Sequence, residues 1–136
     1  LDLLQLHGTE PPARVAALKA RTGVPVMKVI KVAIQSDLDR AAPYRDAADW
    51  LMFDAKPPKD ASRPGGNARA FNWRVLKNQT FALPWLLAGG LTAENLAEAV
   101  KTSGAVAVDV SSGVEDAPGV KNVDKIRAFL AAAAAL

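Results

Sequence analysis

Short apolar runs alternate with longer amphipathic segments along the whole chain. The five apolar runs cover residues 1–6, 26–33, 49–55, 84–89 and 105–110. Runs of this length are typical of parallel strands, which are buried on both faces of a sheet. The pattern therefore predicts a parallel sheet of five strands.

The segments that follow these runs predict helices, because their apolar residues recur at helical spacing and their ends carry typical boundary residues. The expected boundaries are Pro12 and Gly23 for the first helix, and Ser36, Asn72, Thr92 and Asn122 as starts of the later ones. The apolar residues expected in these helices include Val15, Leu18, Trp73, Leu76, Leu96, Val100, Ile126, Phe129, Leu130 and Ala133. Strict alternation of strand and helix indicates an α/β fold with right-handed crossovers.

Two α/β architectures compete at this point. A five-stranded doubly wound sheet would be complete at 136 residues. A (β/α)8 barrel takes about 250 residues, so this chain would hold five of its eight strand–helix units. Length alone favours the doubly wound sheet.

Composition narrows the classes of function. The net charge is +3 with no basic block, which favours a small anionic molecule over a nucleic acid as the partner. The chain has no cysteine and one histidine, which excludes a thiolate metal site within it and argues against a histidine-built zinc site. No membrane segment or signal peptide is recognisable, so we expect a cytoplasmic protein. Leu1 falls inside a predicted strand, so we expect the protein to start upstream.

Polar and glycine-rich motifs follow four of the predicted strands. They are QLHG (5–8), FDAK (53–56), AGGLTAEN (88–95) and DVSSGVE (109–115). Barrel enzymes carry their chemistry at these strand ends. Gly89 and Gly90 let an anion approach the backbone amides, and Ser112 and Gly113 do the same after the last strand. Either loop alone is equally well explained as an ordinary turn, but two on successive strands favour a phosphate site.

Three side chains at these strand ends are candidates for chemistry or binding. Asp54 ends an apolar strand, where partial desolvation favours the protonated carboxyl that a general acid needs; a solvated loop acid or helix cap is the alternative. We expect His7 to have a binding role at most. Asp109 either faces the substrate or anchors the serines after it. The long loop 56–73, with Gly65 and Gly66 as a hinge, predicts a lid or binding loop, unless it is a plain excursion.

The motifs QLHG, FDAKPP, PGGNARAFNW, LLAGGLTAEN and AVDVSSGVEDAPGVK, in this order, resemble the phosphoribosylanthranilate isomerase family of tryptophan biosynthesis. The resemblance covers the whole chain, from the family's fourth strand to its last helix. It implies a (β/α)8 TIM barrel, of which residues 1–136 would be the C-terminal part, holding strands 4 to 8 and lacking the first three βα units.

The resemblance also implies an activity and the roles of residues. The family converts N-(5'-phosphoribosyl)anthranilate by an Amadori rearrangement into 1-(2-carboxyphenylamino)-1-deoxyribulose 5-phosphate, with no metal or organic cofactor. The family's general acid falls on Asp54 and its phosphate loops fall on Gly89, Gly90, Ser112 and Gly113. His7 matches a histidine near the anthranilate end of the site, and we count Asp109 as substrate-binding.

Departures from the family limit what this chain does alone. The family's base is a cysteine in a KICG-like motif on its first strand, and an arginine that helps to hold the substrate lies in the same part. This chain has neither that strand nor a cysteine, and Ala68 and Asn72 stand where glycine and aspartate are usual. We therefore expect an inactive chain whose open barrel edges are covered by a missing N-terminal segment or by self-association.

Two alternatives stay open. One is a related phosphate-binding barrel such as indole-glycerol-phosphate synthase, for which Lys28 or Lys31 would be the catalytic lysine. The other is a non-catalytic phosphate-binding half-barrel that works as a dimer or with a partner.

Overall fold

The computed structural model describes residues 1–55 and 72–136. Its sheet consists of β1 (Leu4–Leu6), β2 (Val26–Val32), β3 (Trp50–Ala55) and β4 (Trp85–Ala88), all parallel and in this order. These strands fall within four of the predicted apolar runs.

The expected fifth strand at 105–110 is reduced to one bridge. Val108 bridges to Leu87, whose N–H donates to Ala107 O at 3.0 Å while Asp109 N–H donates to Leu87 O at 2.8 Å. Within the described residues the only strand that this segment pairs with is β4, so no further ladder extends from it. A parallel strand inside a sheet needs a partner on each side to satisfy its backbone groups.

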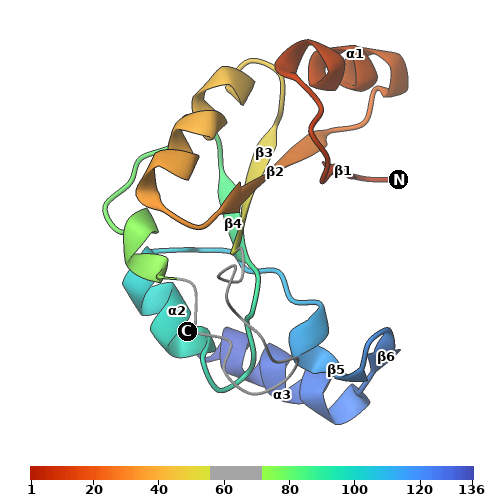
Figure 1. Ribbon diagram of the computed structural model, residues 1–136. Helices are drawn as coiled ribbons and strands as arrows, with labels where there is room; N and C mark the ends of the chain where they lie inside the picture. The colour runs from red at the N-terminus through yellow and green to blue at the C-terminus, as the bar shows by residue number, and fades with distance from the viewer. Residues whose placement is uncertain (56–71) are drawn as a thin grey trace.

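The helices lie along one side of the sheet and follow one another in chain order (Figure 1). They are α1 (Pro12–Thr22), η1 (Gln35–Tyr44), η2 (Trp73–Leu76), α2 (Leu96–Ser103) and α3 (Val123–Ala134), with a short turn η3 (Ser112–Val114). Residues of these helices share two hydrophobic clusters with one face of the sheet. The other face carries a cluster built only from strand residues, namely Met27, Val29, Met52 and Ala88, with Leu86 packed against it.

This one-sided arrangement excludes the doubly wound sheet, which has helices on both faces and a reversal of strand order. Consecutive order with helices on one side is the arrangement of a barrel wall. The fold is thus α/β with a parallel sheet of the barrel kind. For orientation, the helix-covered face is called the outer face and the face of Met27 and Val29 the inner face.

The sequence predicted some helix boundaries correctly. Pro12 is the first residue of α1, where its missing N–H costs nothing. Gly23 ends that helix in the left-handed conformation, with φ 66°. Asn72 accepts from Arg74 N–H at 3.3 Å, and Asn122 accepts from the N–H groups of Asp124 and Lys125 at the start of α3.

Two other expected boundaries are wrong. Ser36 lies inside η1; the carboxylate of Asp37 instead accepts from Ala33 N–H at 2.8 Å at the start of this helix. Thr92 lies before α2, and the N-cap of this helix is Asn95.

Two further expectations fail near the C-terminus. Leu130 is 61% exposed although Phe129 beside it is buried, because α3 turns only a narrow stripe towards the hydrophobic core. A short antiparallel hairpin of β5 (Glu115–Ala117) and β6 (Val120–Lys121) was not predicted. Pro118 and Gly119 form its turn, and Gly119 has a φ of 80°.

The expected lid, with Gly65 and Gly66 as its hinge and Ala68 as a departure from the family, lies outside the described residues. Among the described residues, no helix has the length and hydropathy needed to span a membrane.

Candidate active site

All seven candidate residues from the sequence line one pocket of about 290 Å³ at the carboxyl ends of the strands. They are His7, Asp54, Gly89, Gly90, Asp109, Ser112 and Gly113. The parallel register explains the convergence, because Asp54 pairs with Lys31 of β2 and with Ala88 of β4. Parallel strands end at the same edge of a sheet, so residues far apart in the sequence meet there.

His7 and Asp54 form a pair at the inner edge of the pocket. His7 Nε2 lies 3.3 Å from Asp54 Oδ2, and the two side chains are 48% and 24% exposed. On its other side, His7 Nδ1 lies 3.5 Å from Gln5 Nε2. An amide nitrogen can only donate, so this arrangement favours an Nδ1 acceptor and an Nε2–H that faces the carboxylate. Gln5 also lines the pocket, and the sequence offered no signal for it beyond its place in QLHG.

The two glycine-containing loops that line this pocket touch each other. A Cβ atom on Gly113 would lie 1.8 Å from Leu91 O, so only glycine permits this approach. Gly90 has a φ of 68° with open space beyond its Cα atom. Backbone amides beside open space, without side chains over them, suit an anion such as phosphate.

Asn95 holds the first of these loops, a role that sequence reasoning missed. Its Oδ1 accepts from Thr92 N–H at 2.8 Å and its Nδ2 donates to Gly90 O at 2.9 Å. The side chain therefore bridges the turn that carries Gly90. The sequence did carry a signal for this role, namely an asparagine three residues after the turn Gly–Leu–Thr. Thr92 is an equally typical N-cap residue, so the sequence alone does not distinguish the two.

Asp109 lines the pocket, where its backbone is fixed by the hydrogen bond to Leu87.

Of the two lysines considered for a synthase, Lys28 is buried and ion-paired with Glu10 at 2.8 Å, whereas Lys31 is exposed beside Asp54 in the register. A lysine already engaged by a carboxylate is a poor proton shuttle. Among residues 1–55 and 72–136, no cluster of three His, Asp or Glu side chains suits a metal ion.

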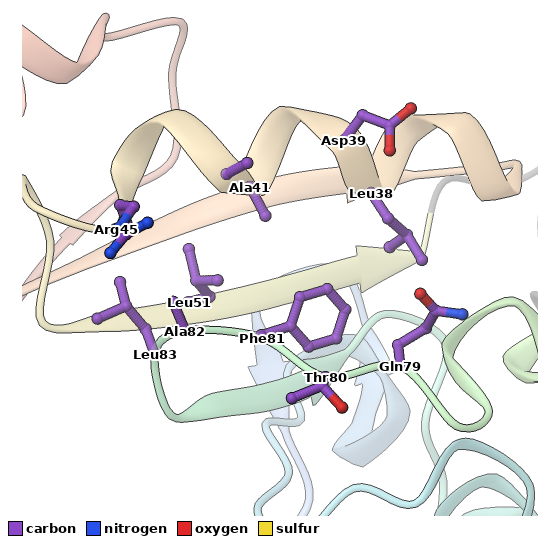
Figure 2. A pocket seen from close by; sticks show the side chains of 11 residues that line it. Leu38, Asp39, Ala41, Arg45, Leu51, Gln79, Thr80, Phe81, Ala82 and Leu83 are labelled. Carbon is purple, nitrogen blue, oxygen red and sulfur yellow. The ribbon is translucent and has the colours of Figure 1, made fainter.

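A second pocket, of about 280 Å³, lies between η1 and the segment that leads into β4 (Figure 2). Leu38, Leu51 and Phe81 converge there, whereas Asp39 points away from Phe81 (Figure 2). Leu51 belongs to the outer face, opposite to Asp54. This pocket is mainly apolar and brings no pair of titratable groups together, so it is not the candidate active site.

Comparison with known proteins agrees with the geometry. Residues 1–132 match the model of the family described as N-(5'phosphoribosyl)anthranilate (PRA) isomerase. The N-(5'-phosphoribosyl)anthranilate isomerase of Paramagnetospirillum magneticum is 62% identical over 98% of this chain, and that of Paracoccus denitrificans is 60% identical over 99%. The chain spans 62% and 63% of the lengths of these two relatives.

Solved structures give the same result. The phosphoribosyl anthranilate isomerase of Thermotoga maritima matches all of this chain with a TM-score of 0.82 and 34% identity, over 63% of its own length. A phosphoribosyl anthranilate isomerase in complex with reduced 1-(o-carboxyphenylamino)-1-deoxyribulose 5-phosphate matches with a TM-score of 0.78 and 31% identity. With a parallel sheet of the barrel kind and a matched family model over nearly its whole length, the chain belongs to the N-(5'-phosphoribosyl)anthranilate isomerase family.

Proposed function

We propose that this chain supplies the general acid and the phosphate-binding loops of a phosphoribosylanthranilate isomerase in tryptophan biosynthesis. The observation that carries the proposal is the pocket that is lined both by the His7–Asp54 pair and by two touching glycine loops. Its substrate would be N-(5'-phosphoribosyl)anthranilate, a small anionic molecule. The family's role in biosynthesis supports a cytoplasmic location, which is part of the proposal.

Asp54 is the proposed general acid. It gives its proton to the ring oxygen of the ribose as the C1'–O bond breaks, which leaves a Schiff base between C1' and the anthranilate nitrogen. Loss of the proton leaves a carboxylate, and His7 Nε2 at 3.3 Å is placed to stabilise that charge. A base then removes the C2' proton, and the enolamine tautomerises to the ketone.

The phosphate anchor keeps the ribose in place through both steps. Gly89, Gly90, Ser112 and Gly113 all line the pocket, and their backbone amides are the proposed donors to the phosphate. Holding the substrate by a group remote from the reacting atoms turns binding energy into orientation. Asp109, which lines the same pocket, is proposed as a further substrate contact.

The base and part of the barrel come from outside these residues in our proposal. Residues 1–136 contain no cysteine and would form strands 4 to 8 of one barrel domain. The free side of β1 and of residues 105–110 would pair with further strands, supplied by a preceding segment or by a second chain. Val106, 95% exposed, and Leu3, 37% exposed, are apolar side chains near these edges.

A complementation assay tests the function. We expect no turnover from the 136-residue chain alone, and formation of the ketose product after mixing with a separately made segment that carries three upstream βα units. Full activity of the chain alone as a monomer would contradict the proposed split of acid and base. Phosphate binding with no turnover in the mixture would favour the non-catalytic half-barrel instead.

A further inference from the structure

Lys28 is a buried charge that the proposed chemistry does not use. Its side chain is 3% exposed, and it lies on the outer face of β2 between Val26 and Ile30. Burying an ammonium group is costly unless all its donors find acceptors. A buried lysine therefore needs an acceptor for each of its N–H donors.

All three donors of the ammonium group are engaged by one short segment. Nζ donates to Leu6 O at 3.3 Å, to Gly8 O at 2.8 Å and to Glu10 Oε2 at 2.8 Å. An ammonium group has three N–H donors, so this set is complete. The segment Leu6–Glu10 is the connection that follows β1, and it carries His7.

Glu10 closes the arrangement from its own side. Its Oε1 accepts from Gly8 N–H at 3.2 Å, and its backbone carbonyl accepts from Tyr44 OH at 2.8 Å. The hydrogen bond from Lys28 lowers the pKa of the Glu10 carboxyl, so it stays ionised at neutral pH. The Tyr44 ring lies 5.7 Å from Lys28 Nζ, within reach of a cation–π contact.

The two backbone carbonyls that Lys28 binds lie next to His7 in the sequence. Leu6 O and Gly8 O belong to the residues on either side of His7, and Gly8 N–H is held as well. Alternate residues of a strand point to opposite faces, so Lys28 grips this segment from the outer side while His7 projects to the inner one. The hydrogen bonds therefore fix the backbone on both sides of His7, whose Nε2 lies 3.3 Å from Asp54 Oδ2.

We propose that Lys28 is a positioning residue: its buried ammonium group clamps the segment Leu6–Glu10 and thereby sets His7 against Asp54. Lys28 does not touch the substrate in this account. Its effect on turnover rests on the proposed function, whereas the placement of His7 can be measured without any turnover.

The single histidine of the chain makes that measurement direct. The ¹⁵N NMR spectrum of imidazole nitrogens reports one residue and distinguishes a protonated from an unprotonated ring nitrogen. We expect the parent chain to show a protonated Nε2 and an unprotonated Nδ1. Lys28→Met, which keeps most of the apolar part of the side chain but removes the donors, should move both signals towards the average of two tautomers.

Lys19→Met is the matched control. Lys19 is also a lysine ion-paired with a carboxylate of a loop, at 2.6 Å from Asp49 Oδ1, but it holds no residue next to His7. Its loss should leave the imidazole signals unchanged. Should Lys28→Met fail to fold, Glu10→Gln is read in the same way, since it keeps a neutral hydrogen bond to Lys28 and should give a smaller change of the same sign.

Turnover gives the second readout, in the complemented enzyme. Lys28→Met should lower kcat by up to about 10²-fold, the loss that a misplacement of about 1 Å can cause, with little change in KM because the phosphate loops are untouched. Unchanged imidazole signals in a folded Lys28→Met chain would overturn the proposal. Inactivity of the unmodified mixture would instead count against the proposed function and leave the NMR result standing.

Discussion

Replacing Gly113 by alanine tests whether the contact between the two glycine loops builds the anion site. A Cβ atom at this position would lie 1.8 Å from Leu91 O and 2.9 Å from Leu91 C. Both are backbone atoms, so no side-chain rotation relieves the overlap. The loops of residues 89–91 and 111–113 must therefore separate by roughly 1 Å or more.

The overlap with backbone atoms of Leu91 sets the loss of unfolding free energy that we expect. Overpacking a well-packed region costs about 1–3 kcal/mol. Because the alanine meets backbone rather than the end of a flexible side chain, we expect Gly113→Ala to lose about 3 kcal/mol of unfolding free energy, the upper part of that range. Separation of the loops also withdraws amide donors from the anion, and a loss of about 1.4 kcal/mol is a tenfold rise in Kd for inorganic phosphate.

The assay combines urea unfolding with a phosphate titration followed by the NMR signal of the Gly90 amide. Gly23→Ala is the matched control, because Gly23 has a φ of 66° with open space around its Cα atom, at the end of α1. Left-handed backbone costs alanine about 1–2 kcal/mol, so this variant is destabilised without touching the loops. We expect it to bind phosphate as the parent does. An unchanged phosphate affinity of Gly113→Ala, or an equal loss of affinity in both variants, would contradict this prediction.

Three further outcomes follow from the described structure. In the complete enzyme, Asp54→Asn should lower kcat about 10²–10⁴-fold with little change in KM, because proton donation matters in the transition state; steady-state kinetics showing near-normal turnover would remove Asp54 from the mechanism. The hydrogen bond from Lys19 holds the pKa of Asp49 below its ordinary value of 3.8, so its stabilisation is present above that value and is lost as pH falls through the lower, folded-state pKa. Urea unfolding from pH 7 down to pH 3 should thus show a smaller loss of stability for Asp49→Asn than for the parent, and equal losses would contradict this assignment. Phe129→Ala should cost about 3–5 kcal/mol and Leu130→Ala less than about 0.5 kcal/mol by the same method, since only Phe129 is buried; similar costs would show that α3 packs differently.

Much of the fold was predictable because it depends on neighbours along the chain. Apolar runs located four strands, since burial of both faces of a parallel strand favours apolar residues at most of its positions. Pro12, Gly23, Asn72 and Asn122 marked helix ends through their own backbone preferences and side-chain acceptors. The order of the motifs at the strand ends was also enough to predict which residues share a pocket.

Tertiary structure decided what depends on partners distant in sequence. Residues 105–110 have the composition of a strand, yet pairing at one edge leaves only the bridge to Leu87. Lys28 reads as a candidate catalyst, but the alternation of β2 turns it to the outer face, where Glu10 engages it. Asp54 and His7, 47 residues apart in the printed numbering, meet at 3.3 Å only because parallel pairing brings the ends of their strands to one edge. Local pattern carries burial and backbone preference, whereas the direction of a charged side chain and its partner depend on the register of strands that no local pattern records.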